Sequence, residues 1–151
     1  MLLIKNAEVP ASGGGRCDLL LGGGRILRME ADIRISRKYC EIIDARNLIT
    51  VPGFIDGHVH MMGGGGEGGF ASRTPDLQLS DAIQGGITTV VGCLGTDGIT
   101  RTMAGLMAKA RALEEEGLTT FLYSGSYGVP MRTLHESIEE DLIYIDKVIG
   151  A

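Results

Sequence analysis

The sequence lacks the cysteine pattern on which two classes of small protein depend. Its three cysteines, Cys17, Cys40 and Cys93, are odd in number and far apart, so they form neither a disulfide framework nor a CxxC metal knuckle. We interpret them as free thiols and expect a cytoplasmic protein. The apolar stretch at the N-terminus is too short for a signal peptide, and no segment approaches the ~20 apolar residues of a membrane span.

Positive charge is also scarce. The sequence has 14 Lys and Arg residues against 19 Asp and Glu residues, which gives a net charge of -5. This sign is wrong for a protein that binds nucleic acid or an anionic membrane surface, so we expect neither partner. A small molecule or another protein is the expected partner.

Glycine, in contrast, is abundant. The chain has 24 glycines in 151 residues, more than twice the usual share of roughly 7%. With 44% hydrophobic and 22% charged residues, the composition is otherwise that of a folded domain and excludes a disordered or collagen-like chain. The glycines therefore indicate many tight backbone sites within one fold.

The chain changes character near Pro52. Residues 1–51 contain short runs rich in Leu and Ile, bounded by Gly, Pro or Asn, which predict a small β-sandwich module. In residues 52–151, short apolar strands alternate with helices, a pattern typical of βα units that build a parallel sheet. We therefore expect two domains, 1–51 and 52–151.

Three βα units are predicted in the second domain, with strands that begin near residues 53, 88 and 119. Thr74 and Pro75 have the pattern of an N-cap and first position of the first helix. The second helix has one apolar face and ends at Gly117, and Ser137 opens the third. A closed (β/α)₈ barrel needs eight units and ~250 residues, so these units form either a small open α/β sheet or the N-terminal part of a barrel.

His58 and His60 end the first predicted strand of this domain. Side chains two positions apart on a strand share a face and have Cα atoms about 6.6 Å apart, so both imidazoles can reach one metal ion. In barrel enzymes catalytic groups gather at this carboxyl end of the strands. The pair therefore predicts a metal site, with two incidental strand-end histidines as the alternative.

A glycine loop follows the histidines, and residues 63–69 have the sequence GGGGEGG. It contains a formal GxGxxG, which is typical of dinucleotide binding, but no helix opens after it and Glu67 would face a pyrophosphate. A flexible loop with a solvated glutamate is another alternative. We favour a loop whose main-chain amides approach a substrate, with Glu67 as the anchor of a cationic group.

The chain resembles the isoaspartyl (β-aspartyl) dipeptidases of the amidohydrolase superfamily. The segments that carry the resemblance are VPGFIDGHVHMMGGGGEGGFASRTPD, VVGCLGTDGITR and SGSYGVPMRT. The PGFID and HVH motifs of the first segment are typical of the whole superfamily. The glycine loop, GTD and Y-VP-RT are the motifs that indicate the dipeptidases within it. The resemblance implies a (β/α)₈ TIM-like barrel of which this chain holds the N-terminal part, about three βα units after the β module.

The resemblance also implies a metal centre. His58 and His60 match the pair that holds one ion of a two-zinc site. The family adds a carboxylated lysine on strand four, two later histidines and an aspartate base, none of which is identified here. We expect the lysine just past Ala151 and the 151-residue chain to be an inactive fragment of a homo-oligomeric metalloprotease.

Further residues match the family's substrate contacts. Gly65, Gly66, Glu67 and Thr96 correspond to the groups that hold the free α-amino end of a β-aspartyl dipeptide. Tyr127 matches the catalytic tyrosine that polarises the scissile carbonyl and stabilises the oxyanion. Without the resemblance, a strand-end aromatic would be assigned to packing under a loop.

The predicted function is therefore zinc-dependent hydrolysis of β-aspartyl dipeptides. The alternatives are a cyclic-amide hydrolase of the dihydroorotase or hydantoinase kind, a non-catalytic scaffold with the same fold, and a nucleotide-binding domain. Cyclic amides lack a free α-ammonium group, and a scaffold is expected to lose its metal ligands. Glu67 and the histidine pair are the features that discriminate against these two alternatives.

Overall fold

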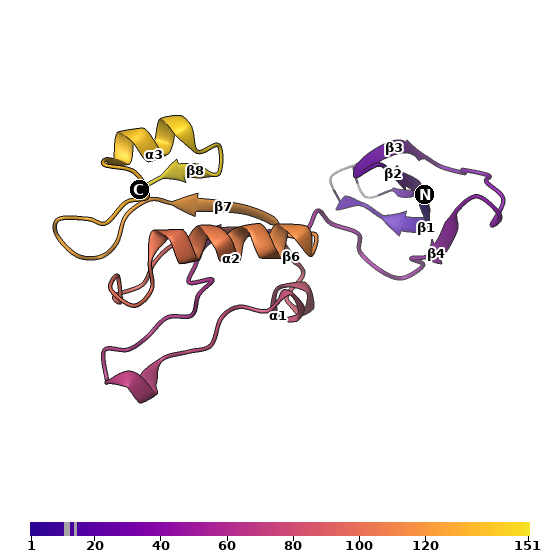
Figure 1. Cartoon of the computed structure of the whole chain (residues 1–151). Coiled ribbons are helices and arrows are strands. Elements are labelled where there is room, and N and C mark those ends of the chain that lie inside the picture. Colours follow the sequence, from indigo (N-terminus) through magenta and orange to yellow (C-terminus); the bar gives the residue numbers. More distant parts are fainter. Residues whose placement is uncertain (11–12, 14) are drawn as a thin grey trace. The chain divides into compact units, whose positions relative to one another are not determined.

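The computed structural model describes residues 1–10, 13 and 15–151 (Figure 1). The chain divides into two compact units, Met1–Pro52 and Gly53–Ala151. Among the described residues no helix combines the length and the apolar character needed to cross a membrane.

The first unit is built on one mixed sheet. Its four strands are β1 (Leu2–Glu8), β2 (Arg16–Gly22), β3 (Arg25–Glu30) and β4 (Glu41–Asp44), in the order β3-β2-β1-β4. β2 pairs antiparallel with β1 and β3, and β4 runs parallel to β1. Within the described residues this unit has a single sheet, whereas the expected sandwich requires two facing sheets.

The second unit contains a parallel sheet. Its strands, in spatial and chain order, are β5 (Phe54–Val59), β6 (Ile87–Gly92), β7 (Thr119–Tyr123) and β8 (Val148–Gly150), and each pairs in parallel with the next. The helices between them are α1 (Leu79–Gln84), α2 (Met103–Glu115) and α3 (Ile138–Tyr144). This alternation confirms the predicted α/β class, and it places the carboxyl ends of the strands at one edge.

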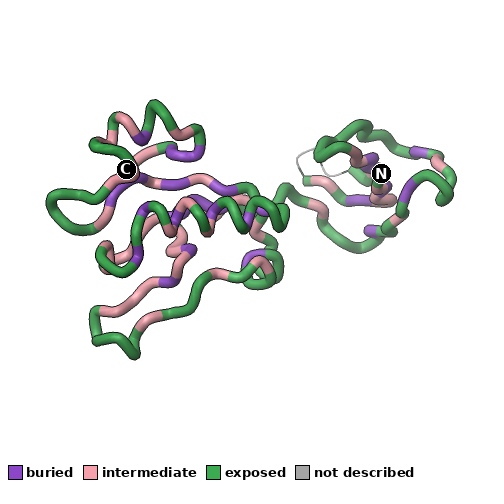
Figure 2. The backbone as a smooth tube through the Cα atoms, viewed as in Figure 1, coloured by how far each residue is buried: buried purple, intermediate pink, exposed green. Residues whose placement is uncertain are grey.

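Helix α2 forms the core of this unit with the sheet. Its buried positions fall on one face at helical spacing (Figure 2), and they are Met103, Leu106, Ala110 and Leu113. They pack with strand residues that include Val90 and Leu122. The Thr102 hydroxyl caps the helix by accepting a hydrogen bond from the amide of Gly105 at 3.1 Å. The predicted apolar face therefore identified the core correctly.

The prediction that Thr74 caps the first helix is wrong. Helix α1 is instead capped by Gln78, four residues later, and the Gln78 amide donates to the Asp81 carboxylate at 3.0 Å. The Thr74 hydroxyl accepts a hydrogen bond from the amide of Gly64 at 2.7 Å. Thr74 therefore stabilises the glycine loop, a tertiary contact that overrides the local capping pattern.

A buried carboxylate fixes the segment between β7 and α3. Asp141 is fully buried and accepts hydrogen bonds from the Ser124 hydroxyl at 2.5 Å and from the amides of Leu134 and His135 at 2.9 and 2.8 Å. The Nδ1 atom of His135 lies 2.9 Å from the same carboxylate. Tyr127 lies in this segment, between Ser124 and Leu134. Asp141 therefore fixes the chain on both sides of Tyr127.

Replacing Asp141 with alanine is expected to lower the free energy of unfolding by about 3 kcal/mol, because each buried donor left without an acceptor costs about 1–3 kcal/mol. Urea unfolding followed by far-ultraviolet circular dichroism measures the loss. The control is Glu139→Gln, at an exposed residue of α3. A loss no larger than that of the control would show that the Asp141 contacts do not stabilise the unit.

Candidate active site

The histidine pair lies where β5 ends. His58 is the fifth residue of this strand and His60 follows its last residue, Val59. The two imidazole rings meet edge to face, with centroids 5.3 Å apart. The predicted same-face arrangement therefore places both rings together at the carboxyl edge of the sheet.

The structure adds Cys93 to this pair. Cys93 follows β6, the strand next to β5, and one donor atom from each of His58, His60 and Cys93 lies within 4.8 Å of the others. The Cys93 sulfur is 3.4 Å from Nδ1 of His60. Two imidazole nitrogens and a sulfur form a donor set that suits zinc, so the residues present fit the metal that the resemblance implies.

The environment of Cys93 favours its neutral thiol. Burial raises the pKa of the Cys93 thiol, and the negative charge of Asp56 raises it further. The thiol donates a hydrogen bond to the Val59 carbonyl at 3.7 Å. Without a bound cation, Cys93 is therefore a hydrogen-bonding group at this edge.

An open cavity of about 370 Å³ lies at the same edge. Its walls include His58, Cys93, Ser126, Tyr127 and Met131. The Tyr127 residue is 80% exposed, so it does not pack in the core. The candidate catalytic tyrosine and one candidate metal ligand therefore line one cavity.

Glu67 and Thr96 meet although they come from two different loops. The Thr96 hydroxyl donates to the Glu67 carboxylate at 2.7 Å. This hydrogen bond, followed by that from Glu67's own amide, lowers the pKa of the Glu67 carboxyl below its usual value. Both residues line a second open cavity, of about 490 Å³. The arrangement provides an exposed anionic group that can receive a cation.

The glycine loop is folded against the residues that follow it. Gly63 and Gly65 have φ angles of 76° and 73°, and a Cβ atom would lie 2.1 Å from the Thr74 carbonyl oxygen at Gly63 and 2.4 Å from that of Ser72 at Gly65. The amide of Gly66 donates to the Ser72 hydroxyl at 3.2 Å. A substrate that approached the Gly66 amide would therefore compete with Ser72.

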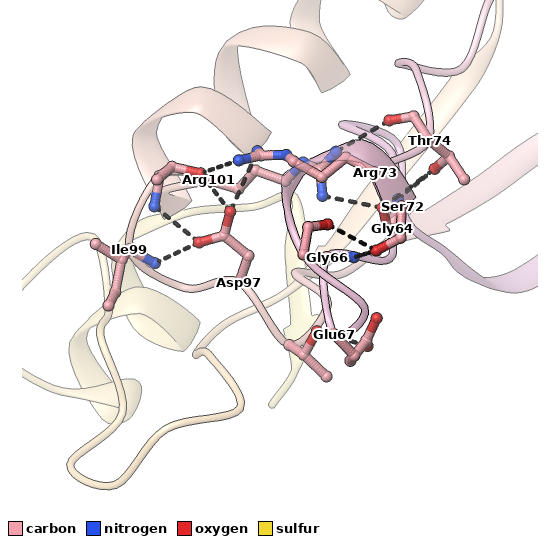
Figure 3. A network of polar contacts seen from close by, with 12 residues as sticks. Gly64, Gly66, Glu67, Ser72, Arg73, Thr74, Asp97, Ile99 and Arg101 are labelled. Carbon is pink, nitrogen blue, oxygen red and sulfur yellow. Dashed lines mark hydrogen bonds and ion pairs between the residues drawn. The ribbon is translucent and has the colours of Figure 1, made fainter.

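Arg101 joins the glycine loop to the segment that returns from it (Figure 3). Its guanidinium donates to the carbonyl of Gly64 at 3.1 Å and to that of Thr74 at 3.0 Å. Arg101 is only 6% exposed, so these bonds are protected from water. The sequence offered a weak signal, a cation at the end of the GTDGITR segment, and Arg101 was not predicted as a site residue.

A second arginine links the two loops that carry Glu67 and Thr96. Arg73 lies 3.2 Å from the Asp97 carboxylate and donates to the Thr100 hydroxyl at 2.8 Å (Figure 3). Asp97 also accepts hydrogen bonds from the side chain and amide of Thr100. The two arginines therefore hold the geometry in which Glu67 contacts Thr96.

The contribution of Asp97 to stability is expected to depend on pH. Hydrogen bonds from Thr100, with a smaller effect of Arg73, lower the pKa of the Asp97 carboxyl from 3.8 to about 2. Because the folded-state pKa is depressed, the stabilisation is complete well above pH 3.8 and is lost as the pH falls through about 2. In urea unfolding, Asp97→Asn should be less stable than the native chain at pH 6, and this difference should shrink towards pH 2. A difference that is constant from pH 6 to pH 2 would contradict the assignment.

Similar proteins indicate the family of this chain, although no family model matches the sequence. The β-aspartyl dipeptidase of Fervidobacterium islandicum AW-1, solved in complex with β-Asp-Leu, is 50% identical, with a TM-score of 0.90, over 99% of this chain and 40% of that protein. The dihydroorotase of Staphylococcus epidermidis is 36% identical over 91 residues, which are 60% of this chain and 21% of that enzyme.

A more distant structure shares the fold alone. It is an atrazine chlorohydrolase mutant from Arthrobacter aurescens TC1, complexed with zinc and atraton. It is 19% identical, with a TM-score of 0.55, over 85% of this chain and 37% of that protein.

The chain spans about two fifths of the dipeptidase and about a fifth of the dihydroorotase. These matches confirm the fold class, βα units of a TIM-barrel enzyme preceded by a small β unit. The chain therefore belongs to the amidohydrolase superfamily, and over nearly its whole length it matches the β-aspartyl dipeptidases of that superfamily.

Proposed function

We propose that this chain supplies part of the active site of a zinc-dependent β-aspartyl dipeptidase. The observation that carries the proposal is the contact of Thr96 with Glu67. A β-aspartyl dipeptide has a free α-ammonium group, and an exposed carboxylate with a lowered pKa is the group that receives it. The 50% identity with a dipeptidase solved with β-Asp-Leu supports the same substrate class.

His58 and His60 would hold one zinc ion of a proposed two-zinc centre. A bound zinc ion lowers the pKa of water towards neutrality and polarises a carbonyl group. The donor atoms at the carboxyl edge of the sheet support this assignment.

The chain's own residues would bind and orient the dipeptide. One oxygen of the Glu67 carboxylate keeps the hydrogen bond from Thr96, and the other accepts one from the α-ammonium group. The Tyr127 hydroxyl donates to the oxygen of the scissile carbonyl and continues to donate as negative charge develops there. Gly65 and Gly66 give the backbone shape that places Glu67 at the cavity.

A cyclic-amide hydrolase is the second candidate. The 36% identity with a dihydroorotase favours it. A dihydroorotate-like substrate has no α-ammonium group, so it gives no reason for an anionic group at Glu67. We therefore rank dipeptide hydrolysis first.

The test is a chimera in which these 151 residues replace the matching part of the Fervidobacterium dipeptidase. The chimera should hydrolyse β-Asp-Leu at a rate close to that of the unmodified enzyme and should leave dihydroorotate intact. Dihydroorotate turnover by the chimera, without β-Asp-Leu turnover, would establish the second candidate instead.

The 151-residue chain alone is expected to show no turnover of β-Asp-Leu above background. The family's carboxylated lysine, later histidines and aspartate base have no identified counterpart in its motifs, so the proposed two-zinc centre and its base are incomplete in this chain. An assay at high protein concentration with added zinc measures this. Steady turnover that depends on the chain would contradict the prediction.

A cytoplasmic location and a homo-oligomeric state also remain predictions.

A further inference from the structure

Cys93 has no role in the proposed function, although it lies against one of the proposed metal ligands. Its sulfur is 3.4 Å from Nδ1 of His60, and a donor atom of His58 lies within 4.8 Å of both residues' donor atoms. We propose that Cys93 is a third protein ligand, so that His58, His60 and Cys93 together hold a divalent metal ion in this chain. The inference extends the proposed metal pair and rests on it.

The observed spacing agrees with a shared ion. Zinc binds nitrogen at about 2.0 Å and sulfur at about 2.3 Å, so in a tetrahedral site the nitrogen and sulfur ligands are about 3.5 Å apart. The distance between the Cys93 sulfur and the His60 nitrogen is 3.4 Å. Donor atoms within 4.8 Å of one another need only small side-chain rotations to contact one ion.

The position of Cys93 follows from the topology. His60 comes directly after β5 and Cys93 directly after β6, and these neighbouring parallel strands end at the same edge. The amide of Cys93 donates to the Val59 carbonyl at 2.9 Å, which fixes the backbone beside the histidines. The pairing of β5 with β6 therefore fixes the position of the sulfur, which belongs to the first residue after β6.

The binding step needs no oxidant. The S–H bond of Cys93 breaks, its proton passes to solvent, and the sulfur forms a bond to the metal ion. The two neutral imidazoles each donate a nitrogen lone pair. Such an N₂S set leaves one position of a tetrahedral ion open and favours zinc or cobalt over magnesium, calcium or manganese.

The competing explanation is that Cys93 only hydrogen-bonds. Its thiol already donates to the Val59 carbonyl, and its carbonyl oxygen lies 3.4 Å from Nδ1 of His60. In that case a metal ion held by the histidines would not contact sulfur. Absorption spectroscopy separates the two explanations, because only a sulfur–cobalt bond gives an intense near-ultraviolet charge-transfer band.

The experiment is a Co²⁺ titration of the reduced 151-residue chain without any dipeptide. The native chain should develop the sulfur–cobalt band with one ion per chain. Cys93→Ser should lose the band and bind Co²⁺ at least about tenfold more weakly, since even the loss of an outer-shell partner costs 10–100-fold. The control Cys17→Ser removes a thiol that is also partly buried but lies in the other unit, and it should keep the band.

A second measurement requires no variant. Iodoacetamide labelling of the native chain, followed by mass spectrometry, should show that Zn²⁺ protects Cys93 but leaves the labelling of Cys17 unchanged.

The cobalt titration also needs a control for folding. Circular dichroism of Cys93→Ser, and of Cys93→Ala as a second variant, establishes whether a lost sulfur–cobalt band reflects a lost ligand or a lost fold.

The inference is overturned if the native chain binds no Co²⁺, if bound Co²⁺ gives no sulfur band, or if the band persists in Cys93→Ser. Cobalt bound without a sulfur band would leave the histidine pair, and the proposed dipeptidase function, intact. Conversely, a sulfur band together with a chimera that fails to hydrolyse β-Asp-Leu would refute the proposed function and leave the Cys93 site standing.

Discussion

Replacing Tyr127 with phenylalanine in the chimera is expected to lower kcat for β-Asp-Leu by about 10²–10³-fold, the usual cost of removing one oxyanion donor. Because the hydroxyl acts mainly in the transition state, KM should change far less than kcat. Tyr127 is exposed and lines the same cavity as His58, and both observations support this role. Steady-state kinetics at saturating zinc measures both constants.

The control for Tyr127 is Tyr144→Phe. Tyr144 is also exposed, at 68%, and its ring stacks edge to face on His135, a contact that phenylalanine preserves. Neither variant should change the zinc content of the chimera. An unchanged kcat with a raised KM in Tyr127→Phe would show that this hydroxyl holds only the ground-state substrate.

Glu67→Gln in the chimera should reduce kcat/KM for β-Asp-Leu by about tenfold or more at neutral pH. The change keeps the shape of the side chain and removes its charge, and a hydrogen bond to a charged group is worth about 1.5–3 kcal/mol. N-acetylation of the dipeptide removes the other charge and should cost the native chimera a comparable factor. Glu115→Gln, at an exposed residue of α2, is the control.

The two changes at this contact should not be additive. Because each one removes the same interaction, Glu67→Gln assayed with the acetylated dipeptide should lose little beyond either single change. If the two losses multiply, or if the acetylated dipeptide is cleaved as fast as the free one, Glu67 does not bind the ammonium group. The glycine loop would then be a surface loop with a solvated glutamate.

Sequence periodicity predicted the elements whose local signals agree with their packing. The apolar spacing of α2 matches its buried face, and Ser137 caps α3 by accepting from the Glu140 amide at 3.2 Å. The prediction that Thr74 caps a helix was wrong because its hydroxyl accepts a hydrogen bond from the amide of Gly64, ten residues away. A capping pattern is a local preference, and it is unreliable where a loop folds back on the same residue.

The site was predictable only in part, for a related reason. His58 and His60 are two residues apart, so the period of a strand is enough to bring them together. Cys93 is 33 residues from His60 and becomes its neighbour only through the pairing of β5 with β6. The prediction that Cys93 is a free thiol is confirmed, but sequence spacing could not place that thiol beside His60. Arg73 and Arg101 were missed because their partners also lie in distant segments.

The most direct test of the central claim is a crystal structure of the chimera with β-Asp-Leu bound. We expect the α-amino nitrogen of the dipeptide to lie about 2.7–2.9 Å from a Glu67 carboxylate oxygen, the length of a charge-assisted hydrogen bond, with Thr96 still donating to that carboxylate. A dipeptide whose α-amino group lies beyond hydrogen-bonding distance of Glu67 would contradict the account.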